Sequence, residues 1–220
     1  MSGRPVKIGA SILAADFLNI ESEVKRAEQA KVDSIHIDVM DGHLVSDIAF
    51  GAGNVRSVCG ATDICVDAHL MIARPQSFAM RMIEAGAGII TLQMEPCLDL
   101  YKTISDIKAA NARAYVCIRP ETSAGQLEEV LEWVDGVLLV SVPLGIGGQK
   151  MIPSMKRKIS RLAEYKNKCG YSFEIGVDGG VTTENAAEIT ACGADYLVCG
   201  TTLFASTDMR ATVESLKRRM

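Results

Sequence analysis

The chain lacks both an excess of positive charge and any long apolar run. Its 23 Lys and Arg residues against 27 Asp and Glu residues give a formal net charge of −4, so we expect no broad basic surface for nucleic acid or an anionic membrane. No uncharged apolar stretch reaches the roughly 18 residues that span a bilayer. The N-terminal sequence MSGRPVKIG also lacks the apolar stretch of a secretory signal. We therefore expect a soluble cytoplasmic protein that binds anionic ligands locally.

The cysteine spacings of a disulfide framework or of a CxxC metal site are also missing. The chain has 7 cysteines, an odd number, and this count without a secretory signal is typical of reduced thiols that pack as small hydrophobic groups. The residues concerned are Cys59, Cys65, Cys97, Cys117, Cys169, Cys192 and Cys199.

No linker, charge block or low-complexity segment interrupts the chain, and its 48% hydrophobic content excludes disorder. We therefore predict one domain over residues 1–220. Short β-rich runs alternate with amphipathic stretches from end to end. The runs are KIGASIL (7–13), SIHIDVM (34–40), ICVDAHL (64–70), GIITLQ (88–93), RAYVCI (113–118), GVLLVSV (136–142), SFEIGVD (172–178) and YLVCG (196–200).

The stretches between these runs have the periodicity of helices, and only residues 50–58 fit weakly. The expected helices cover 17–30, 77–87, 100–111, 124–133, 153–167, 184–194 and 209–219. Alternating strands and helices indicate right-handed crossovers and a parallel sheet, and eight units in 220 residues fit a closed (β/α)8 TIM barrel of the phosphate-binding type. An open doubly wound sheet is the alternative, but no GxGxxG turn follows the first run.

Histidine is scarce, with 3 in the chain, and all of them fall at or just after the ends of two neighbouring runs. Residues i and i+2 of a strand share a face, so His36 and Asp38 point the same way, as do Asp67 and His69. Each pair alone is equally well explained as satisfied core polar groups. The run 172–178 ends in VDGG and places Asp178 at the same rim of the barrel.

Two imidazoles and two carboxylates that converge on one rim form a mixed nitrogen and oxygen site. Such a site suits one divalent transition metal ion, namely zinc, iron(II), manganese or cobalt. A dication also keeps both carboxylates ionised, which burial alone would oppose. The alternative is two unrelated polar pairs and a turn aspartate.

Glycines follow three successive strands near the end of the chain and predict a phosphate cradle, with simple turns as the alternative. Glycine lets backbone N–H groups approach a ligand closely, and the last loops of such barrels commonly hold phosphate. The residues concerned are Gly145, Ile146, Gly147, Gly148, Gly179, Gly180, Gly200 and Thr201.

Four further residues near strand ends have two interpretations each. Leu13, Met40 and Met71 lie at or just beyond the ends of the first three runs, where they either cap the metal site with apolar surface or fill the core. His43 lies past a strand end in MDGH, and we expect it to stabilise that loop rather than to act in catalysis.

The segments ASILAADF, HIDVMDGH, DAHLM, GIGGQ, VDGGV and GTTLF together resemble the ribulose-phosphate 3-epimerase family, in the right order over nearly the whole chain. The resemblance implies a (β/α)8 barrel that forms a homo-oligomer, either a dimer or a hexamer, with one divalent metal ion per subunit. It implies that His36, Asp38, His69 and Asp178 hold the metal and that Asp38 and Asp178 exchange the substrate proton. It also implies that Ser11 and His69 contact the substrate and that the glycine loops bind its phosphate.

The chain departs from the family pattern at three places. The family usually has histidine at the position of Gln93, Asn-Pro at Pro143 and Leu144, and PNLTFG where this chain has SDIAFG over residues 46–51. These positions border the sugar rather than the metal, so they bear on substrate identity more than on reaction type.

We therefore predict an isomerase, a metal-dependent ketose-phosphate 3-epimerase that interconverts D-ribulose 5-phosphate and D-xylulose 5-phosphate in the pentose phosphate pathway. An epimerase of a six-carbon ketose phosphate such as D-allulose 6-phosphate is the first alternative. A non-catalytic sugar-phosphate-binding paralogue is the second. A Schiff-base aldolase would need an inward lysine at a strand end, where only Lys7 is available at the wrong end, and a decarboxylase would depend on Arg119 as its cation.

Overall fold

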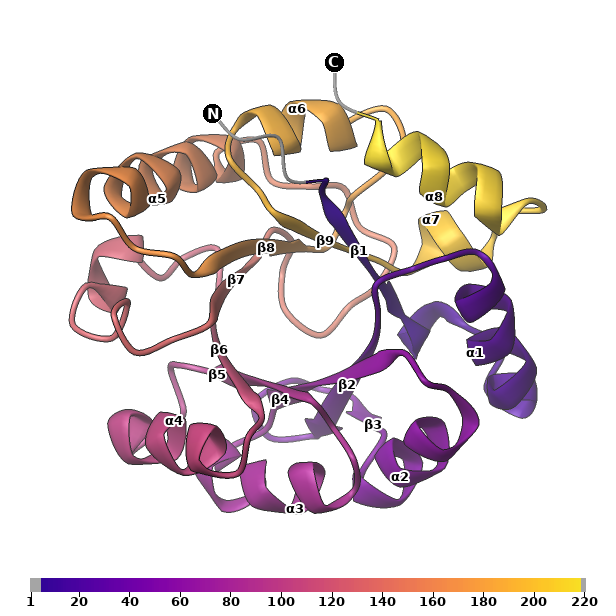
Figure 1. Ribbon diagram of the computed structural model, residues 1–220, viewed down its shortest axis with the longest axis horizontal. Coiled ribbons are helices and arrows are strands. Elements are labelled where there is room, and N and C mark those ends of the chain that lie inside the picture. Colours follow the sequence, from indigo (N-terminus) through magenta and orange to yellow (C-terminus); the bar gives the residue numbers. More distant parts are fainter. Residues whose placement is uncertain (1–4, 219–220) are drawn as a thin grey trace.

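The computed structural model describes residues 5–218, which form a ring of parallel strands surrounded by helices (Figure 1). The strands of the ring are β1 (Lys7–Ser11), β2 (Ser34–Asp41), β4 (Cys65–Met71), β5 (Ile89–Gln93), β6 (Arg113–Ile118), β7 (Gly136–Val140), β8 (Glu174–Asp178) and β9 (Tyr196–Cys199). The ring closes because β1 pairs with both β2 and β9. A short strand, β3 (Ile48–Ala49), adds an antiparallel pairing at the end of β2. The predicted (β/α)8 barrel is confirmed. Residues 1–4 and 219–220 of the predicted domain lie outside the described residues.

The helices pack on the outer face of the ring (Figure 1). They are α1 (Ile20–Gln29), α2 (Ala52–Ala61), α3 (Ala79–Glu84), α4 (Leu100–Ala109), α5 (Met155–Cys169), α6 (Ala186–Ala191), α7 (Thr201–Phe204) and α8 (Met209–Lys217). In α5 the buried residues Met155, Ile159 and Leu162 recur at helical spacing, and Gly170 ends the helix in the left-handed region at φ 71°. Within residues 5–218, no helix has both the length and the apolar character needed to cross a bilayer.

Two stretches differ from the predicted helices. Residues 52–58 of the weakly periodic stretch 50–58 lie in α2, in which Val55 and Val58 alone are buried. The predicted helix over 124–133 is instead a 3-10 helix, Ala124–Leu127, followed by turns. There the amides of Val130 and Trp133 donate to carbonyls three residues back, whereas the amide of Leu131 donates four residues back to Leu127. The stretch therefore has mixed turns rather than one regular α-helix.

The strands carry two separate sets of buried side chains because successive residues face opposite sides. In β2, Ile35, Ile37 and Val39 face the helices and join the large outer core. Complete burial of one such side chain contributes about 1.5–3 kcal/mol. Inside the ring, Tyr115 and Tyr196 pack edge to face at 6.5 Å. The inward residues His36 and Asp38 of β2 and Asp67 and His69 of β4 are buried and polar. The hydrophobic floor therefore supports a polar site above it, with Met40 and Met71 beyond it at the strand ends.

Candidate functional site

Strands β2, β4 and β8 bring four predicted ligands together at the C-terminal end of the barrel. One potential ligand atom from each of His36, Asp38, His69 and Asp178 lies within 4.8 Å of the others. Strand register produces this grouping, since His36 pairs with Asp67 and Asp38 pairs with His69 across β2 and β4. His36 and His69 are fully buried, and Asp38 is 3% exposed. His36, Asp38 and His69 are therefore enclosed, and the partly exposed Asp178 completes the cluster.

Asp67 fixes the direction in which His36 presents its ring. The His36 Nδ1 atom lies 2.8 Å from Asp67 Oδ2, and Thr91 donates to the other Asp67 oxygen at 2.7 Å. A proton on Nδ1 leaves the Nε2 lone pair free. Among the described residues, Nε2 is buried without a hydrogen-bond partner and faces Asp38 Oδ1 at 3.2 Å. An unpartnered imidazole nitrogen beside two carboxylates fits a divalent metal ion.

The pKa shifts within the cluster also favour a bound cation. Burial opposes the charge of Asp38, but His36 and His69 outweigh it and hold the pKa of Asp38 well below its usual range. Burial also opposes the charge of His36, yet Asp38 and Asp67 raise its pKa well above the ordinary value. Burial and the negative charge of Asp38 raise the pKa of Asp178 to about 6. A bound dication would relieve the repulsion between the two carboxylates.

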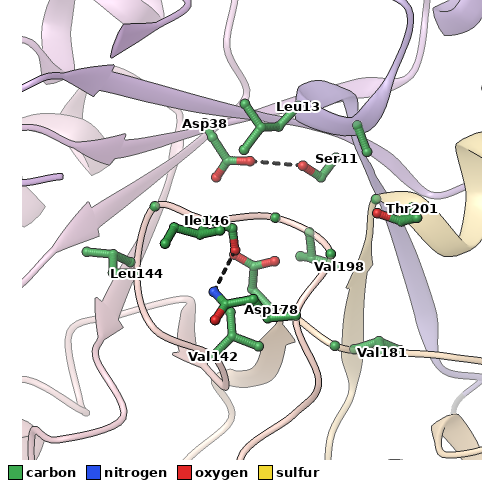
Figure 2. A pocket seen from close by; sticks show the side chains of 18 of the residues that line it. Ser11, Leu13, Asp38, Val142, Leu144, Ile146, Asp178, Val181, Val198 and Thr201 are labelled. Carbon is green, nitrogen blue, oxygen red and sulfur yellow. Dashed lines mark hydrogen bonds between the residues drawn. The ribbon is translucent and has the colours of Figure 1, made fainter. Parts of the chain in front are cut away.

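A cavity of about 1310 Å³ opens above this cluster. Asp38 and Ser11 lie on one wall, where the Ser11 hydroxyl donates to Asp38 Oδ2 at 2.9 Å, and Asp178 faces them (Figure 2). The cavity is therefore bordered by two carboxylates from different sides of the ring, a geometry that suits proton transfer to and from a flat intermediate.

The predicted glycine loops line the other side of the cavity. Its lining includes Gly145, Ile146, Gly147, Gly148, Gly179, Gly180, Gly200 and Thr201. The loops fit closely together, because a Cβ atom at Gly180, which has φ 65°, would lie 2.3 Å from the Met151 amide nitrogen. Within residues 5–218, the amides of Gly147, Gly148 and Gly180 donate no hydrogen bond to another backbone group. These N–H groups are available to an anionic ligand.

The remaining predicted residues are placed less uniformly. Leu13 and Met71 line the cavity, whereas Met40 is buried beside Met71 in a small apolar cluster and is not among the lining residues described. His69, for which the family resemblance implies substrate contact, is fully buried and is likewise not among the lining residues. The side chain of His43 is 77% exposed, and its Nδ1 atom lies 2.9 Å from the Asp41 carbonyl oxygen, which places it on the loop after β2.

Sequence reasoning did not assign the residues that hold the two imidazoles from behind. Asp67 was paired with His69 by spacing, but it contacts His36 on the neighbouring strand. Thr91 and Gln93 are fully buried polar residues of β5. Their alternation along the strand with apolar residues signals that they face inward. Gln93 was expected to border the sugar, but it contacts His69 and is not among the residues that line the cavity.

Comparison with known proteins gives one consistent family. The family model described as the ribulose-phosphate 3 epimerase family matches residues 7–204. The chain is 38% identical to the ribulose-phosphate 3-epimerase of Bacillus subtilis over 215 residues, which cover 96% of this chain and 98% of that protein. It is 37% identical to the ribulose-phosphate 3-epimerase of Methanocaldococcus jannaschii, with 96% and 90% of the two chains covered.

Solved structures share the fold at low sequence identity. A 3-hexulose-6-phosphate synthase is similar with a TM-score of 0.69 and 18% identity, covering 96% of this chain and 98% of that one. Orotidine 5'-phosphate decarboxylase from Pyrococcus horikoshii is similar with a TM-score of 0.68 and 14% identity, covering 96% and 97%. At these identities the likeness shows the barrel alone.

Proposed function

The chain belongs to the ribulose-phosphate 3 epimerase family, and from this premise we propose that it interconverts D-ribulose 5-phosphate and D-xylulose 5-phosphate. The observation that carries the proposal is the pair of carboxylates, Asp38 and Asp178, facing each other across a cavity whose far wall is built from glycine loops. Inversion at a carbon next to a ketone requires this arrangement, because one group removes the proton and another returns a proton on the opposite face.

His36, Asp38, His69 and Asp178 would hold one divalent metal ion, and zinc, iron(II), manganese and cobalt all suit this ligand set. When bound, the ion supplies a Lewis acid that stabilises negative charge on the substrate oxygens. The buried Nε2 atom of His36 and the close approach of the two carboxylates support this site.

The two aspartates divide the proton transfer between them. In the metal-free cluster the pKa of Asp38 is lowered and that of Asp178 is raised to about 6. We therefore assign Asp38 as the carboxylate that accepts the C3 proton and Asp178 as the group that returns one. Return of a proton from the opposite carboxyl group to the enediolate gives the epimer. In the reverse direction the roles exchange. Ser11 donates to the second oxygen of Asp38 and so holds that carboxylate toward the cavity.

The glycine loops would hold the phosphate and thereby fix which carbon lies between the carboxylates. Free amides at Gly147, Gly148 and Gly180 support this role, because N–H groups bind an anion without requiring a lysine. Binding energy gained at the phosphate is remote from C3 and serves to orient the sugar.

A six-carbon ketose phosphate such as D-allulose 6-phosphate is the second candidate substrate. The loop that departs from the family pattern borders the cavity, which is lined by Ser46, Asp47 and Ile48 and also by Leu144. Because these side chains line the cavity, they support a role in selecting the length of the sugar chain.

The proposal is tested by measuring kcat/KM for both ketose phosphates by NMR after removal of metal with a chelator and after its return. We expect the metal-free protein to be inactive, the reloaded protein to epimerise at C3, and the pentulose to be preferred. Preference for D-allulose 6-phosphate would replace the substrate assignment, and binding of both sugars without turnover would identify a sugar-phosphate-binding paralogue.

We also propose that the chain works as a single-domain subunit of a homo-oligomer, either a dimer or a hexamer, in the cytoplasm. Exposed apolar side chains such as Phe17, Leu18 and Ile48 support association. The cysteines of the described residues are all free thiols, which suits a reducing compartment. Light scattering on the purified protein determines the subunit number.

A further inference from the structure

Gln93 lies behind His69, on the side away from Asp38, and its amide group bridges His69 to Glu95. The His69 Nε2 atom lies 3.2 Å from Gln93 Oε1, and Gln93 Nε2 donates to Glu95 Oε2 at 2.6 Å. Gln93 is fully buried, so no water competes for these bonds. The orientation of this one amide therefore decides which hydrogen-bonding role remains for the Nε2 atom of His69.

Glu95 determines that orientation because its carboxylate is itself held in place. Its Oε1 atom accepts from the Arg119 amide at 2.9 Å and from the Thr122 hydroxyl. Burial opposes the charge, but these bonds and the bond from Gln93 hold the pKa of Glu95 below its ordinary value. An ionised carboxylate only accepts hydrogen bonds. The amide nitrogen of Gln93 must therefore face Glu95, and its oxygen must face His69.

We propose that Gln93 and Glu95 are positioning residues that fix the orientation and tautomer of His69. The Gln93 oxygen accepts the Nε2 proton of His69, so Nδ1, which lies 3.2 Å from Asp38 Oδ1, is the nitrogen left to bind a metal held beside Asp38. This inference rests on the proposed metal site and assigns a function to two residues that never touch the cavity.

The two imidazole rings are consequently held in opposite tautomers by hydrogen-bond partners on opposite sides. Asp67 engages Nδ1 of His36 and frees Nε2, whereas Gln93 engages Nε2 of His69 and frees Nδ1. Both free nitrogens then flank the same oxygen of Asp38, each at 3.2 Å. These two nitrogens and the Asp38 oxygen are the atoms that would hold the ion, together with Asp178.

The test exchanges donor and acceptor along the hydrogen bonds from His69 through Gln93 to residue 95, with a side chain of the same shape at residue 95. In Glu95→Gln the new side chain keeps an oxygen for Arg119 and Thr122 and presents an NH2 group to Gln93, so the Gln93 amide turns and offers a donor to His69. We expect the dissociation constant for manganese(II), measured by EPR of the free ion, to rise about 10- to 100-fold. Thr122→Val is the matched control, because it removes one hydrogen bond to Glu95 without changing polarity, and its affinity is expected to stay within about twofold of wild type.

A second readout reports the tautomer itself. The chain has 3 histidines, so 15N NMR of the diamagnetic zinc-loaded protein resolves each ring. We expect a hydrogen-bonded proton on Nε2 of His69 in the wild type and loss of that signal in Glu95→Gln. Gln93→Leu removes the acceptor altogether and provides the same test if the first variant does not fold.

The outcomes separate this inference from the proposed function. Unchanged affinity and an unchanged Nε2 signal in Glu95→Gln, in a wild type that binds metal, would overturn the positioning role alone. An equal loss in Thr122→Val would also overturn it, since Glu95 would then act by holding the loop. A wild type that takes up neither metal would overturn the proposed site and this inference together.

Discussion

At the scale of single residues, Asp38 has two roles in the proposed site, as a metal ligand and as the base. Its two oxygens have different partners, since Oδ1 lies between the two imidazoles and Oδ2 accepts from Ser11. Asp38→Asn keeps the volume of the side chain but removes the base. We expect kcat for epimerisation to fall by about 10²- to 10⁴-fold while the circular dichroism spectrum is unchanged.

Asp63→Asn provides the control for this prediction. Asp63 is an exposed aspartate that is not among the residues lining the cavity, so its substitution removes the same charge without removing a proton carrier. We expect near wild-type kcat. Full activity of Asp38→Asn, with metal content confirmed by elemental analysis, would contradict the assigned role.

Metal affinity should depend on pH because the ligands must lose protons before they bind. The pKa of His36 is raised well above its usual value, so binding at neutral pH displaces one proton from that ring. As pH falls below about 6, Asp178 also becomes protonated, and a second proton must leave. We expect affinity for manganese(II) to weaken about tenfold per pH unit near neutrality and about a hundredfold per unit below pH 6. Calorimetric titrations from pH 5 to 8 measure this slope, and a constant affinity would contradict the ligand assignment.

At the scale of elements, the glycine loops form the proposed phosphate-binding site. Gly148 has φ 72° and lies in the cavity wall, with Thr201 Oγ1 3.8 Å from the position of an added Cβ. Gly148→Ala strains this backbone and displaces its amide, so we expect KM for the sugar phosphate to rise about tenfold. Gly170→Ala is the matched control. Its φ of 71° is nearly the same, its added Cβ meets open space at the end of α5, and KM should be unchanged. Equal KM values for the two variants would argue against the cradle.

The strands were predictable from the sequence because each combines β-rich residues with bounding turns, and the observed limits differ by only a few residues. The local structure of residues 124–133 was not predictable, since their apolar spacing fits both an α-helix and the 3-10 turns that they form. In the site, His36, Asp38, His69 and Asp178 were predictable because strand ends meet at one rim. The contact between Asp67 and His36 depends on the register between β2 and β4. The residue spacing within one strand does not determine that register.

At the scale of the whole molecule, metal binding should stabilise the fold. The proposed ligands come from strands β2, β4 and β8, so the site exists only in the folded chain. Manganese(II) at about 100 times its dissociation constant contributes about 2.7 kcal/mol, which raises Tm by about 5–10 °C for a chain of this size. Manganese is preferred to zinc here because it binds the thiols of the unfolded chain weakly. His69→Ala should show little of this rise by differential scanning calorimetry, and an equal rise in that variant would place the metal elsewhere.

In the proposed reaction two opposed carboxyl groups move a proton at C3, and NMR in D2O distinguishes this from the return of the same proton. With metal bound and D-ribulose 5-phosphate as substrate, the D-xylulose 5-phosphate formed first should carry deuterium at C3. The incoming proton then derives from a carboxyl group that has exchanged with solvent rather than from the one that removed the original proton. Epimerisation with the original hydrogen retained at C3 throughout would contradict proton transfer between Asp38 and Asp178.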